Sequence, residues 1–483
     1  MTGLLVSYLI DSCLRKYCKG WRPISSKISH PLSWNKALMH DVNARNAFFA
    51  QHGIHDVECL FADISGYPRG KLMPAANFAK GGELRICQAI AMQAVTGDYS
   101  YDPVFPDADP DVRLVPDYTT LKLAPWASTP RALAVHDCVE MDGALCVFAP
   151  RSLLKAVLAR YAAQGLTPVV APEIEFYLTA PNGDPAHALQ PPALRGGRAE
   201  VGQSAFSLNV LNELAPFWDE FRAALRTLGV QTDTWIHEVG SSQFEINLMH
   251  GDPVAVADQA FLFKYAAKEI ALKHGLNAVF MAKPMAGAAG SSMHLHQSVV
   301  NAQGRNIFSA EDGSEAPALR HFIAGLQTYL PDVMLVFAPF TNSYRRYVAG
   351  SQAPVNLQWG YENRTTALRV PASGAAARRV ENRVAGADAN PYLAIAASLA
   401  AGLAGMDEQL TATPPIEDSG YNHPRTLALS LPEAQAQMAA SASARRLLGD
   451  LFVTGYASVK AVEYESYQNE ISAWERRYLL PQV

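Results

Sequence analysis

The sequence predicts an α+β fold, in which helices and strands are mixed along the chain without regular βαβ alternation. Two observations lead to this prediction. Some segments repeat apolar residues at the spacing of a helix, whereas others are short apolar runs or carry polar residues at every second position, as strands do. Neither GxGxxG nor a GxxxxGKS or GxxxxGKT motif occurs, so a Rossmann or P-loop site has no support in the chain.

Composition narrows the class of protein. The 483 residues are 49% hydrophobic, which is enough to form a sizeable core spread over more than one domain. With a net charge of −5 and no basic tract, the chain is not expected to bind nucleic acid. The apolar stretch near the N-terminus is too short for a membrane helix and weak as a signal peptide. No two of the six cysteines have CxxC spacing, so we expect a cytoplasmic protein with reduced thiols.

Residues 41–146 are predicted to form a small domain of short strands and turns. HDVECLFADISGYPRGKLMP contains a strand, a glycine-bearing turn and a second strand-like piece. Residues 1–40 precede this domain as an N-terminal extension, either a flexible segment or the product of a start codon assigned too far upstream.

Residues 147–483 are predicted to form a second, larger domain, because helical periodicity becomes frequent there. RSLLKAVLARYAAQG places its apolar residues on one helical stripe and ends at Gly165, and TPVVAPEIEFYL follows as a strand. Residues 232–248 are strand-like. Further helical segments are expected at 204–229, 258–275, 390–406 and 457–479.

Acidic, histidine and arginine residues repeat at spacing two in three segments of this second domain. APEIEFYL holds Glu173 and Glu175, and GSSMHLHQS holds His294 and His296. Residues at i and i+2 share one face of a strand, so each pair is expected to point the same way. One such run could be an ordinary solvated strand face. Three in one chain favour the lining of a metal-nucleotide site; the third, ARRVENRV, contributes Arg379, Glu381 and Arg383.

Glu238 and Glu245, in HEVGSSQFEIN, add to the possible metal ligands. Carboxylate oxygens are the ligands that Mg²⁺ and Mn²⁺ prefer, whereas Zn²⁺ favours more histidine or cysteine. Five glutamates and one histidine suit two divalent cations, Mg²⁺ or Mn²⁺. The predicted metal ligands are Glu173, Glu175, Glu238, Glu245, His294 and Glu381.

Arginines are concentrated near the third segment. An isolated arginine is usually a surface cation, but several of these lie in NSYRRYVAGSQAPV and YENRTTALRVP, which look strand-like and poor in other charge. The guanidinium group offers a fixed fork for phosphate or carboxylate. Two metal ions with several arginines suit phosphoryl transfer. The arginines are Arg346, Arg364, Arg369, Arg379 and Arg383.

Taken in order, these motifs resemble the glutamine synthetase family. FADISGYPRGK resembles its N-terminal β-grasp motif, and APEIEFYL, HEVGSSQFE, GSSMHLHQS, NSYRRYVAGSQAP, NRTTALR and ARRVENR with ADANPYL resemble its catalytic signatures. The resemblance spans about residues 55–400. It implies a β-grasp domain at 41–146, a glutamine synthetase-type catalytic domain at 147–483, and a homo-oligomer, commonly a dodecamer of two hexameric rings with active sites shared between neighbouring subunits.

The resemblance also assigns roles by position. Glu175, Glu238 and Glu245 correspond to the ligands of one metal ion, and Glu173, His294 and Glu381 to those of a second. The positions that contact nucleotide are His296, Ser298, Arg379 and Arg364. Those that hold glutamate are Gly290, Arg346 and Arg383. Those that neutralise the transferring phosphoryl group are Arg364 and Arg369. The implied reaction uses ATP and glutamate to form γ-glutamyl phosphate, which a nitrogen nucleophile then attacks.

The chain departs from glutamine synthetases where that family holds ammonium. Gln352 stands where the family has a flap glutamate, and a neutral amide is no base. The Asp-Gly-Ser-Ser loop is replaced by TGDYSYDP, in which Asp98 and Asp102 are the only carboxylates. No counterpart of the ammonium-site tyrosine is evident between Ala180 and Gln203. We therefore expect a changed nucleophile, as in the γ-glutamyl-amine ligase branch that includes γ-glutamylpolyamine synthetases.

An amine reaches such a site as a cation and must lose a proton before it attacks. Asp98, Asp102 or Glu238 could attract it and accept the proton. The amine, a polyamine or a small monoamine, is not specified by the residues; Trp359 and Tyr361 could line its pocket or pack in the core. Amine catabolism is the role that the branch suggests. Two alternatives stay open: a glutamine synthetase that uses ammonia, and a non-catalytic oligomeric homologue.

Overall fold

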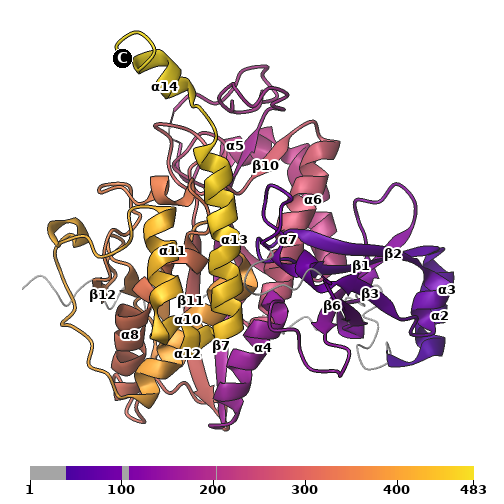
Figure 1. Ribbon diagram of the computed structural model, residues 1–483, viewed down its shortest axis with the longest axis horizontal. Helices are drawn as coiled ribbons and strands as arrows, with labels where there is room; N and C mark the ends of the chain where they lie inside the picture. The colour runs from indigo at the N-terminus through magenta and orange to yellow at the C-terminus, as the bar shows by residue number, and fades with distance from the viewer. Residues whose placement is uncertain (1–39, 101–107, 203) are drawn as a thin grey trace, which may run out of the picture.

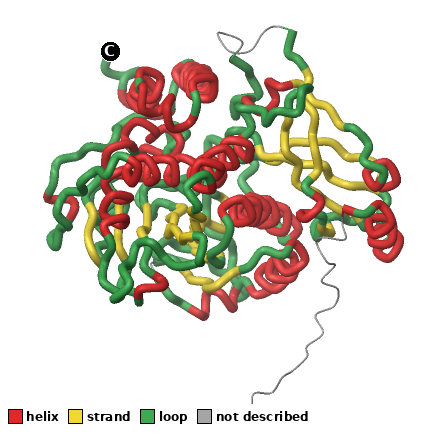
Figure 2. Tube along the Cα trace, turned by 90° about the horizontal axis from the view of Figure 1, so that it is seen from below, coloured by secondary structure: helices red, strands yellow, loops and turns green. Residues whose placement is uncertain are grey.

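The structure is a computed structural model that describes residues 40–100, 108–202 and 204–483. Figure 1 shows a small amino-terminal unit (indigo) beside a larger unit that holds the rest of the chain. In Figure 2 the strands form two separate groups with helices between and around them. The predicted extension falls almost wholly outside the described residues. Among the described residues, no helix is both long and apolar enough to cross a membrane.

The amino-terminal unit is built on a six-stranded sheet of order β2-β1-β6-β4-β3, with β5 paired to β6. Its strands are β1 Asp56–Ala62, β2 Pro68–Pro74, β3 Leu84–Cys87, β4 Asp111–Pro116, β5 Lys122–Leu123 and β6 Arg131–Val139. The predicted strand–turn–strand is confirmed as β1 and β2, which pair antiparallel. Asp63 holds the turn between them, because its Oδ1 accepts the backbone N–H groups of Ser65 and Tyr67, both at 2.9 Å.

The prediction of strands and turns alone was incomplete for this unit. Helix α2, Val42–His52, begins where the Asp41 side chain accepts the backbone N–H of Ala44, and it ends at Gly53 with φ 62°. A shorter helix, α3 Ala75–Ala79, follows β2. Short 3₁₀ turns are η2 Gln88–Met92 and η3 Tyr118–Thr120.

The larger unit contains an eight-stranded, mostly antiparallel sheet of order β12-β13-β14-β11-β7-β9-β8, with β10 paired to β7. Its long central strand, β7 Leu166–Thr179, confirms the strand predicted there. Phe176 and Phe244 point from one face of this sheet into a core of aromatic side chains, in which Trp218 and Phe263 also pack. The other strands are β8 Thr232–His237, β9 Gln243–Leu248, β10 Asn277–Val279, β11 Met293–Asn301, β12 Trp359–Tyr361, β13 Leu368–Val370 and β14 Val380–Asn382.

Helices of the larger unit follow the predicted segments with shifted ends. Helix α7, Pro253–Lys273, begins before the predicted start because the Asp252 side chain caps it at Ala255. The segment predicted as one C-terminal helix is two, α13 Asp450–Gln468 and α14 Ala473–Tyr478, since Ser472 starts a new helix with a capping box. Others are α4 Pro150–Ala162, α5 Leu208–Glu213, α6 Ala215–Leu228, α8 Pro317–Tyr329, α9 Met334–Phe337, α10 Pro391–Asp407, α11 Leu431–Ala440 and α12 Ala442–Leu448.

A buried ionic network joins the two units. Arg151, at the start of α4, forms ion pairs with Asp117 at 2.7 Å and Asp137 at 2.6 Å from the small unit, and with Asp258 of α7 at 2.9 Å. Tyr392 also donates a hydrogen bond to Asp258, at 2.7 Å. Burial and these partners fix the orientation of the small unit against α4 and α7.

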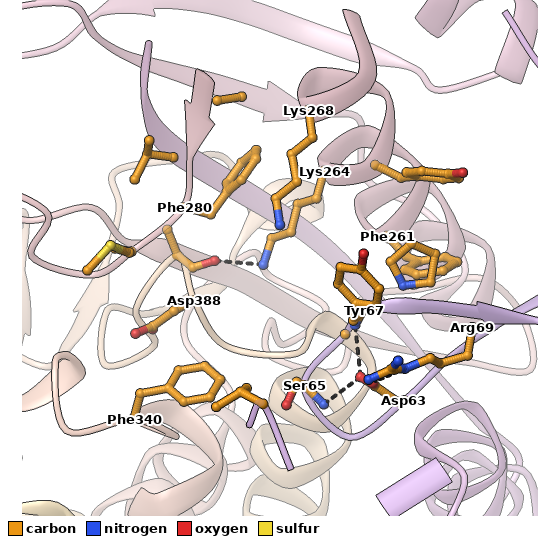
Figure 3. A pocket seen from close by; sticks show the side chains of 18 of the residues that line it. Asp63, Ser65, Tyr67, Arg69, Phe261, Lys264, Lys268, Phe280, Phe340 and Asp388 are labelled. Atoms are coloured by element: carbon orange, nitrogen blue, oxygen red, sulfur yellow. Dashed lines mark hydrogen bonds and ion pairs between the residues drawn. The ribbon is translucent and has the colours of Figure 1, made fainter. Parts of the chain in front are cut away.

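A cavity of about 1040 Å³ lies along the same seam (Figure 3). Lys264 reaches into it from α7 and donates hydrogen bonds to the carbonyl oxygens of Ala387 at 2.7 Å and Ala389 at 2.8 Å. Burial lowers the pKa of this lysine to about 7. None of the residues predicted for the active site lines this cavity, so it lies apart from the polar cluster described next.

Candidate active site

Strand register brings the predicted acidic and histidine residues onto one face of the larger sheet. His294 of β11 pairs with Glu173 of β7, and Glu175 of β7 pairs with Glu245 of β9. On the other side of β11, His296 pairs with Glu381 of β14. Residues directly opposite in an antiparallel pair point to the same face. Segments that lie far apart in the sequence therefore place these side chains in one cluster.

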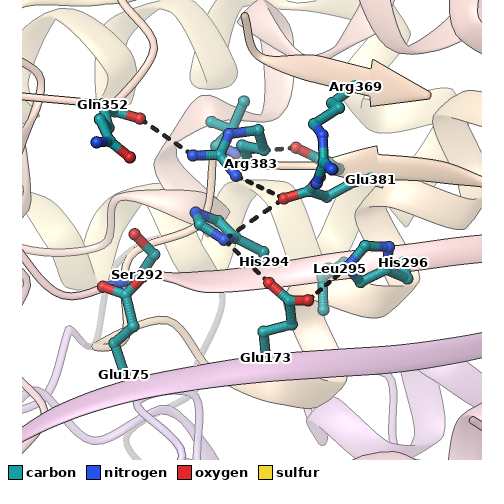
Figure 4. A network of polar contacts seen from close by, with 12 residues as sticks. Glu173, Glu175, Ser292, His294, Leu295, His296, Gln352, Arg369, Glu381 and Arg383 are labelled. Atoms are coloured by element: carbon teal, nitrogen blue, oxygen red, sulfur yellow. Dashed lines mark hydrogen bonds and ion pairs between the residues drawn. The ribbon is translucent and has the colours of Figure 1, made fainter. Parts of the chain in front are cut away.

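His294 lies at the centre of this cluster (Figure 4). Its Nδ1 is 3.5 Å from Oε2 of Glu173 and 3.6 Å from Oε1 of Glu381. The other oxygen of Glu173 lies 2.8 Å from Nε2 of His296. His294 Nε2 is buried and has no hydrogen-bond partner among the described residues. An imidazole nitrogen left free among carboxylates suits a metal ligand.

Two overlapping groups of side chains could each hold a cation. The first is Glu173, His294 and Glu381, and the second is Glu175, Glu245 and His294; within each group the ligand atoms lie within 4.8 Å of one another. The first group is the second-metal set expected from the family resemblance. The second group differs from expectation, because His294 and not Glu238 completes it. Oxygen donors with one imidazole fit Mg²⁺ or Mn²⁺.

The charges in the cluster are unbalanced without a cation. Burial raises the pKa of Glu245 to about 9, and neighbouring carboxylates, Glu173 first among them, add to the rise. Burial likewise raises the pKa of Glu175 to about 7, together with repulsion from Glu238. Burial also raises the pKa of Glu238 itself. Such shifts indicate that a positive ligand would stabilise the site.

Glu173 and Glu381 behave in the opposite way. Burial acts to raise the pKa of Glu173, but hydrogen bonds from His294 and His296 outweigh it and hold that pKa well below its usual range. Burial is also outweighed at Glu381, where Arg383 and the histidines lower the pKa to about 2. The carboxylates nearest the histidines, Glu173 and Glu381, are thus ionised. The pKa values of Glu175, Glu238 and Glu245 are raised instead, because burial outweighs the positive charge near them.

Arginines border the cluster on one side. Glu381 accepts from Arg369 at 2.7 Å and from Arg383 at 2.5 Å. Arg346 is buried, and its guanidinium donates to the hydroxyl of Ser292 at 2.8 Å and to the carbonyl oxygens of Arg383 and Val384, both at 2.9 Å. Arg346 lies in a 3₁₀ turn, η5 Ser343–Arg346, and the prediction that this segment is strand-like was wrong.

Three of the four predicted nucleotide residues line a separate cavity of about 630 Å³ beside the cluster, and Arg364 does not. His296, Ser298 and Arg379 all contribute to its wall, and Glu173 lies where it meets the metal groups. Arg379 Nε donates to Nδ1 of His296 at 3.1 Å. The volume falls within the range of about 300–1,000 Å³ typical of small-molecule sites. The cavity and the cluster together offer adjacent places for a nucleotide and for cations.

Two of the predicted residues stand at the edge of the cluster. Gln352 is exposed, with its backbone at φ 60° and its carbonyl oxygen accepting from Arg383 at 3.3 Å. Arg364 is also exposed and forms no hydrogen bond or ion pair within the described residues, although its charge acts on Glu238.

Gly290 lies in the loop before β11, where an added Cβ would come within 2.8 Å of the Arg346 side chain. Only glycine lets that loop approach Arg346 so closely.

The structure does not bring Asp98 to the cluster within one chain. Its carboxylate accepts a hydrogen bond from the Thr96 hydroxyl at 2.7 Å and contacts none of the described cluster residues. Asp102 lies outside the described residues. Trp359 is fully buried and donates to the Thr413 carbonyl at 2.7 Å, which favours core packing over an amine pocket. The exposed Tyr361 is hydrogen-bonded to Glu315 and Arg320.

Two residues of the site were missed from the sequence. The backbone N–H of Ser292 donates to Glu175 at 2.8 Å, while its hydroxyl accepts from Arg346, so it links a predicted metal ligand to a predicted glutamate-binding arginine. Its position two before His294 is the same spacing that singled out the histidines. Glu362 pairs with Arg369 at 3.0 Å, and no pattern in the sequence marks it.

Comparison with known proteins gives a family match over most of the chain. The family model described as "Glutamine synthetase, catalytic domain" matches residues 148–479. Among solved structures, "Apo GmaS without ligand" superposes with a TM-score of 0.77 at 29% identity, and the match covers 90% of this chain and 98% of that one. The larger unit is therefore a catalytic domain of this type.

Three characterised relatives are similar over nearly their whole length. The gamma-glutamylputrescine synthetase of Escherichia coli (strain K12) is 34% identical over 432 residues, covering 88% of this chain and 91% of the relative. A glutamate–isopropylamine ligase from a Pseudomonas species is 32% identical, with coverages of 89% and 96%. The glutamine synthetase of Pyrococcus abyssi (strain GE5 / Orsay) is 33% identical, with coverages of 86% and 92%.

Proposed function

The chain belongs to the glutamine synthetase family, and from that premise we propose that it is an ATP-dependent ligase that joins the γ-carboxylate of glutamate to an amine. The observation that carries the proposal is the cluster on the larger sheet, in which Glu173, Glu175, Glu245, His294 and Glu381 share one face. Paired carboxylates beside an arginine-bordered pocket suit phosphoryl transfer, where catalysis is mainly positioning and charge neutralisation.

The roles we assign follow the family positions. Two divalent cations, Mg²⁺ or Mn²⁺, would be held by Glu173, Glu175, Glu238, Glu245, His294 and Glu381, and when bound they would neutralise the phosphates of ATP. ATP would occupy the cavity lined by His296, Ser298 and Arg379. Glutamate would bind at Arg346, Arg383 and the loop of Gly290.

The reaction has two steps. In the first, a γ-carboxylate oxygen of glutamate attacks the γ-phosphorus of ATP, and ADP leaves; Arg364 and Arg369 offset the charge on the transferring group. In the second, the amine nitrogen attacks the acyl carbon of γ-glutamyl phosphate, the C–O bond to phosphate breaks, and the nitrogen gives up a proton to a nearby carboxylate. Products are ADP, phosphate and a γ-glutamyl amide.

An amine is favoured over ammonium because of Gln352. The residue stands at the flap beside Arg383, where a carboxylate would both attract ammonium and take its proton, and an amide can do neither. Two of the three relatives compared are named for amines, putrescine and isopropylamine. The nucleophile of this chain is accordingly a polyamine or a small monoamine.

The test is phosphate release by the purified protein with ATP, Mg²⁺ and glutamate. Ammonium is compared with putrescine, spermidine, spermine, ethylamine, isopropylamine and phenylethylamine, and the amide product is identified by mass spectrometry. We expect turnover with one amine class and little with ammonium. Turnover with ammonium alone would replace the proposal with a glutamine synthetase, and no ATP turnover with any nucleophile would exclude both.

The glutamine synthetase alternative is retained for a specific reason: the Pyrococcus relative is as similar as the amine ligases are. The non-catalytic alternative is disfavoured because every predicted metal ligand and arginine is present in the sequence. A β-grasp fold for the small unit, a cytoplasmic location and assembly into hexameric rings or a dodecamer belong to the same proposal.

A further inference from the structure

Glu238 depends on its backbone for its position. It lies in the turn between β8 and β9, residues 238–242, and within the described residues its carboxylate accepts one hydrogen bond, from the adjacent Val239 N–H at 3.1 Å. No arginine or histidine in the described parts of the chain forms an ion pair with Glu238, in contrast to Glu173 and Glu381. Whatever fixes this turn therefore also fixes Glu238 relative to Glu175 and Glu245.

One buried carboxylate outside the cluster clamps the turn at both ends. Oε2 of Glu200 accepts the backbone N–H of Ser242 at 2.6 Å and lies 3.1 Å from Nε2 of His237. His237 directly precedes Glu238, and Ser242 comes three residues before Glu245. Glu200 is 9% exposed, and both of its partners are fully buried. A short hydrogen bond to a backbone amide is stronger in such buried surroundings than in water.

The clamp holds a conformation that the turn would otherwise resist. Ser242 has φ 57°, in the left-handed region, which is a strained conformation for a residue other than glycine. The next residue, Gln243, donates to the Gly290 carbonyl at 2.9 Å, so the turn also touches the loop assigned to glutamate. If Ser242 left this conformation, both the position of Glu238 and the contact of Gln243 with the Gly290 loop would change.

Glu200 acts from behind the sheet and does not face the reacting groups. His237 pairs with Phe244, and their rings pack edge to face with centroids 5.3 Å apart. These side chains point away from the face that carries Glu245. The second oxygen of Glu200, Oε1, is buried without a hydrogen-bond partner among the described residues. A buried acidic side chain with one oxygen unpaired contributes little to stability by itself.

We propose that Glu200 is a positioning residue, which sets the β8–β9 turn through His237 and Ser242 and so aims Glu238 at the carboxylate cluster. The inference rests on the proposed function for the role of Glu238. It predicts that loss of the clamp weakens the binding of a divalent cation to the folded protein before any substrate is present. Partners that orient metal ligands typically change affinity or activity by about 10–100-fold when removed.

The test uses Glu200→Gln and Glu200→Ala, with Glu213→Gln as the matched control. Glu213 is a glutamate at the end of α5 that lies outside the clamp and whose ion-pair partner is Arg195, 3.7 Å away. Mn²⁺ binding is measured by calorimetry on the full-length proteins without substrates, alongside thermal unfolding. We expect both Glu200 variants to bind Mn²⁺ at least about 10-fold more weakly, and the control to match the parent. Parental Mn²⁺ affinity in both variants would overturn the proposal.

A second variant separates positioning from general destabilisation. Ser242→Gly lets the turn keep its φ without strain, so in the Glu200→Gln background it should restore part of the Mn²⁺ affinity. A fall in Mn²⁺ affinity that merely follows the melting temperature, with no rescue, would assign Glu200 a structural role only. If the parent makes no γ-glutamyl amide, the proposed function fails, whereas the metal titration still decides the role of Glu200.

Discussion

At the scale of the residue, the side chain of Glu245 is surrounded by carboxylates and accepts no hydrogen bond from any described residue. Its folded-state pKa, about 9, lies above the ordinary value of 4.5, with burial as the main cause. In the metal-free protein the group stays protonated where the unfolded chain would ionise. Its contribution to stability is therefore complete below pH 4.5 and is lost as the pH rises toward 9.

Glu245→Gln should remove this pH dependence. Because the amide cannot ionise, we expect the metal-free variant to melt at a higher temperature than the parent near about pH 8 and at a similar temperature near about pH 5. The same variant should gain less stability from added Mg²⁺ and lose at least roughly 100-fold in ligase activity. Thermal unfolding across pH, with and without Mg²⁺, checks this; a lower melting temperature for the metal-free variant at pH 8 would contradict it.

Gln352→Glu should shift the choice of nucleophile. A carboxylate at this position would lie beside Arg383 at the mouth of the cluster, where it could attract ammonium and accept its proton. We expect kcat/KM for ammonium relative to the preferred amine to rise by about 10-fold, or 1.4 kcal/mol. Steady-state kinetics with both nucleophiles measure the ratio. Gln352→Ala is the control, and an equal rise in that variant would show that the charge is irrelevant.

At the scale of the element, the predicted strands and helices were mostly found because their patterns are local. The spacing of Glu173 and Glu175 or of His294 and His296 identifies a strand face without knowledge of its neighbours. The start of α7 shifted because Asp252 caps it, and the predicted C-terminal helix is divided because the capping box at Ser472 starts α14.

Contacts that cross between elements could not be predicted in this way. The His294–Glu173 and Glu175–Glu245 pairs depend on strand order and register, which one sequence does not specify. Glu200 was missed for the same reason, since its partners lie about forty residues away. The motif resemblance supplied the ligand set, and only the structure supplied its geometry.

The seam between the units gives an element-scale prediction. Arg151→Ala would leave Asp117, Asp137 and Asp258 facing one another without their shared cation. Breaking a buried pair by removing one partner costs about 3–5 kcal/mol. We expect a loss of that size in the free energy of unfolding from urea titration. Arg160→Ala, on the same helix, removes a single hydrogen bond among the described residues, to the Leu447 carbonyl, and should cost much less.

At the scale of the whole molecule, the position of Asp98 bears on assembly. Asp98 contacts none of the described cluster residues in its own chain, yet the family resemblance predicts an amino-terminal loop at each active site. The two statements agree if the loop serves the site of a neighbouring subunit. In that arrangement the proposed assembly of subunits would be required for activity, and not only for stability.

Subunit complementation tests this arrangement. Asp98→Ala and Glu245→Gln, each impaired alone, should regain activity when co-expressed, because some sites then combine an intact loop with an intact cluster. Random assembly would restore up to about a quarter of the sites. Co-expressed Glu245→Gln and Glu381→Gln, which damage the same cluster, should show no recovery. If co-expressed Asp98→Ala and Glu245→Gln chains are no more active than the two variants measured separately and added, Asp98 lies outside the active site.

The antiparallel pairing of β7 with β11 has a consequence for folding. If β11 slipped by one residue, His294 and His296 would turn into the aromatic core, and Met293 and Leu295 would face the carboxylates. A slipped molecule would have no imidazole to offer a cation. Binding of the metal would thus stabilise only chains in which β7 and β11 are correctly aligned. The ion that serves the chemistry would therefore also select the native register.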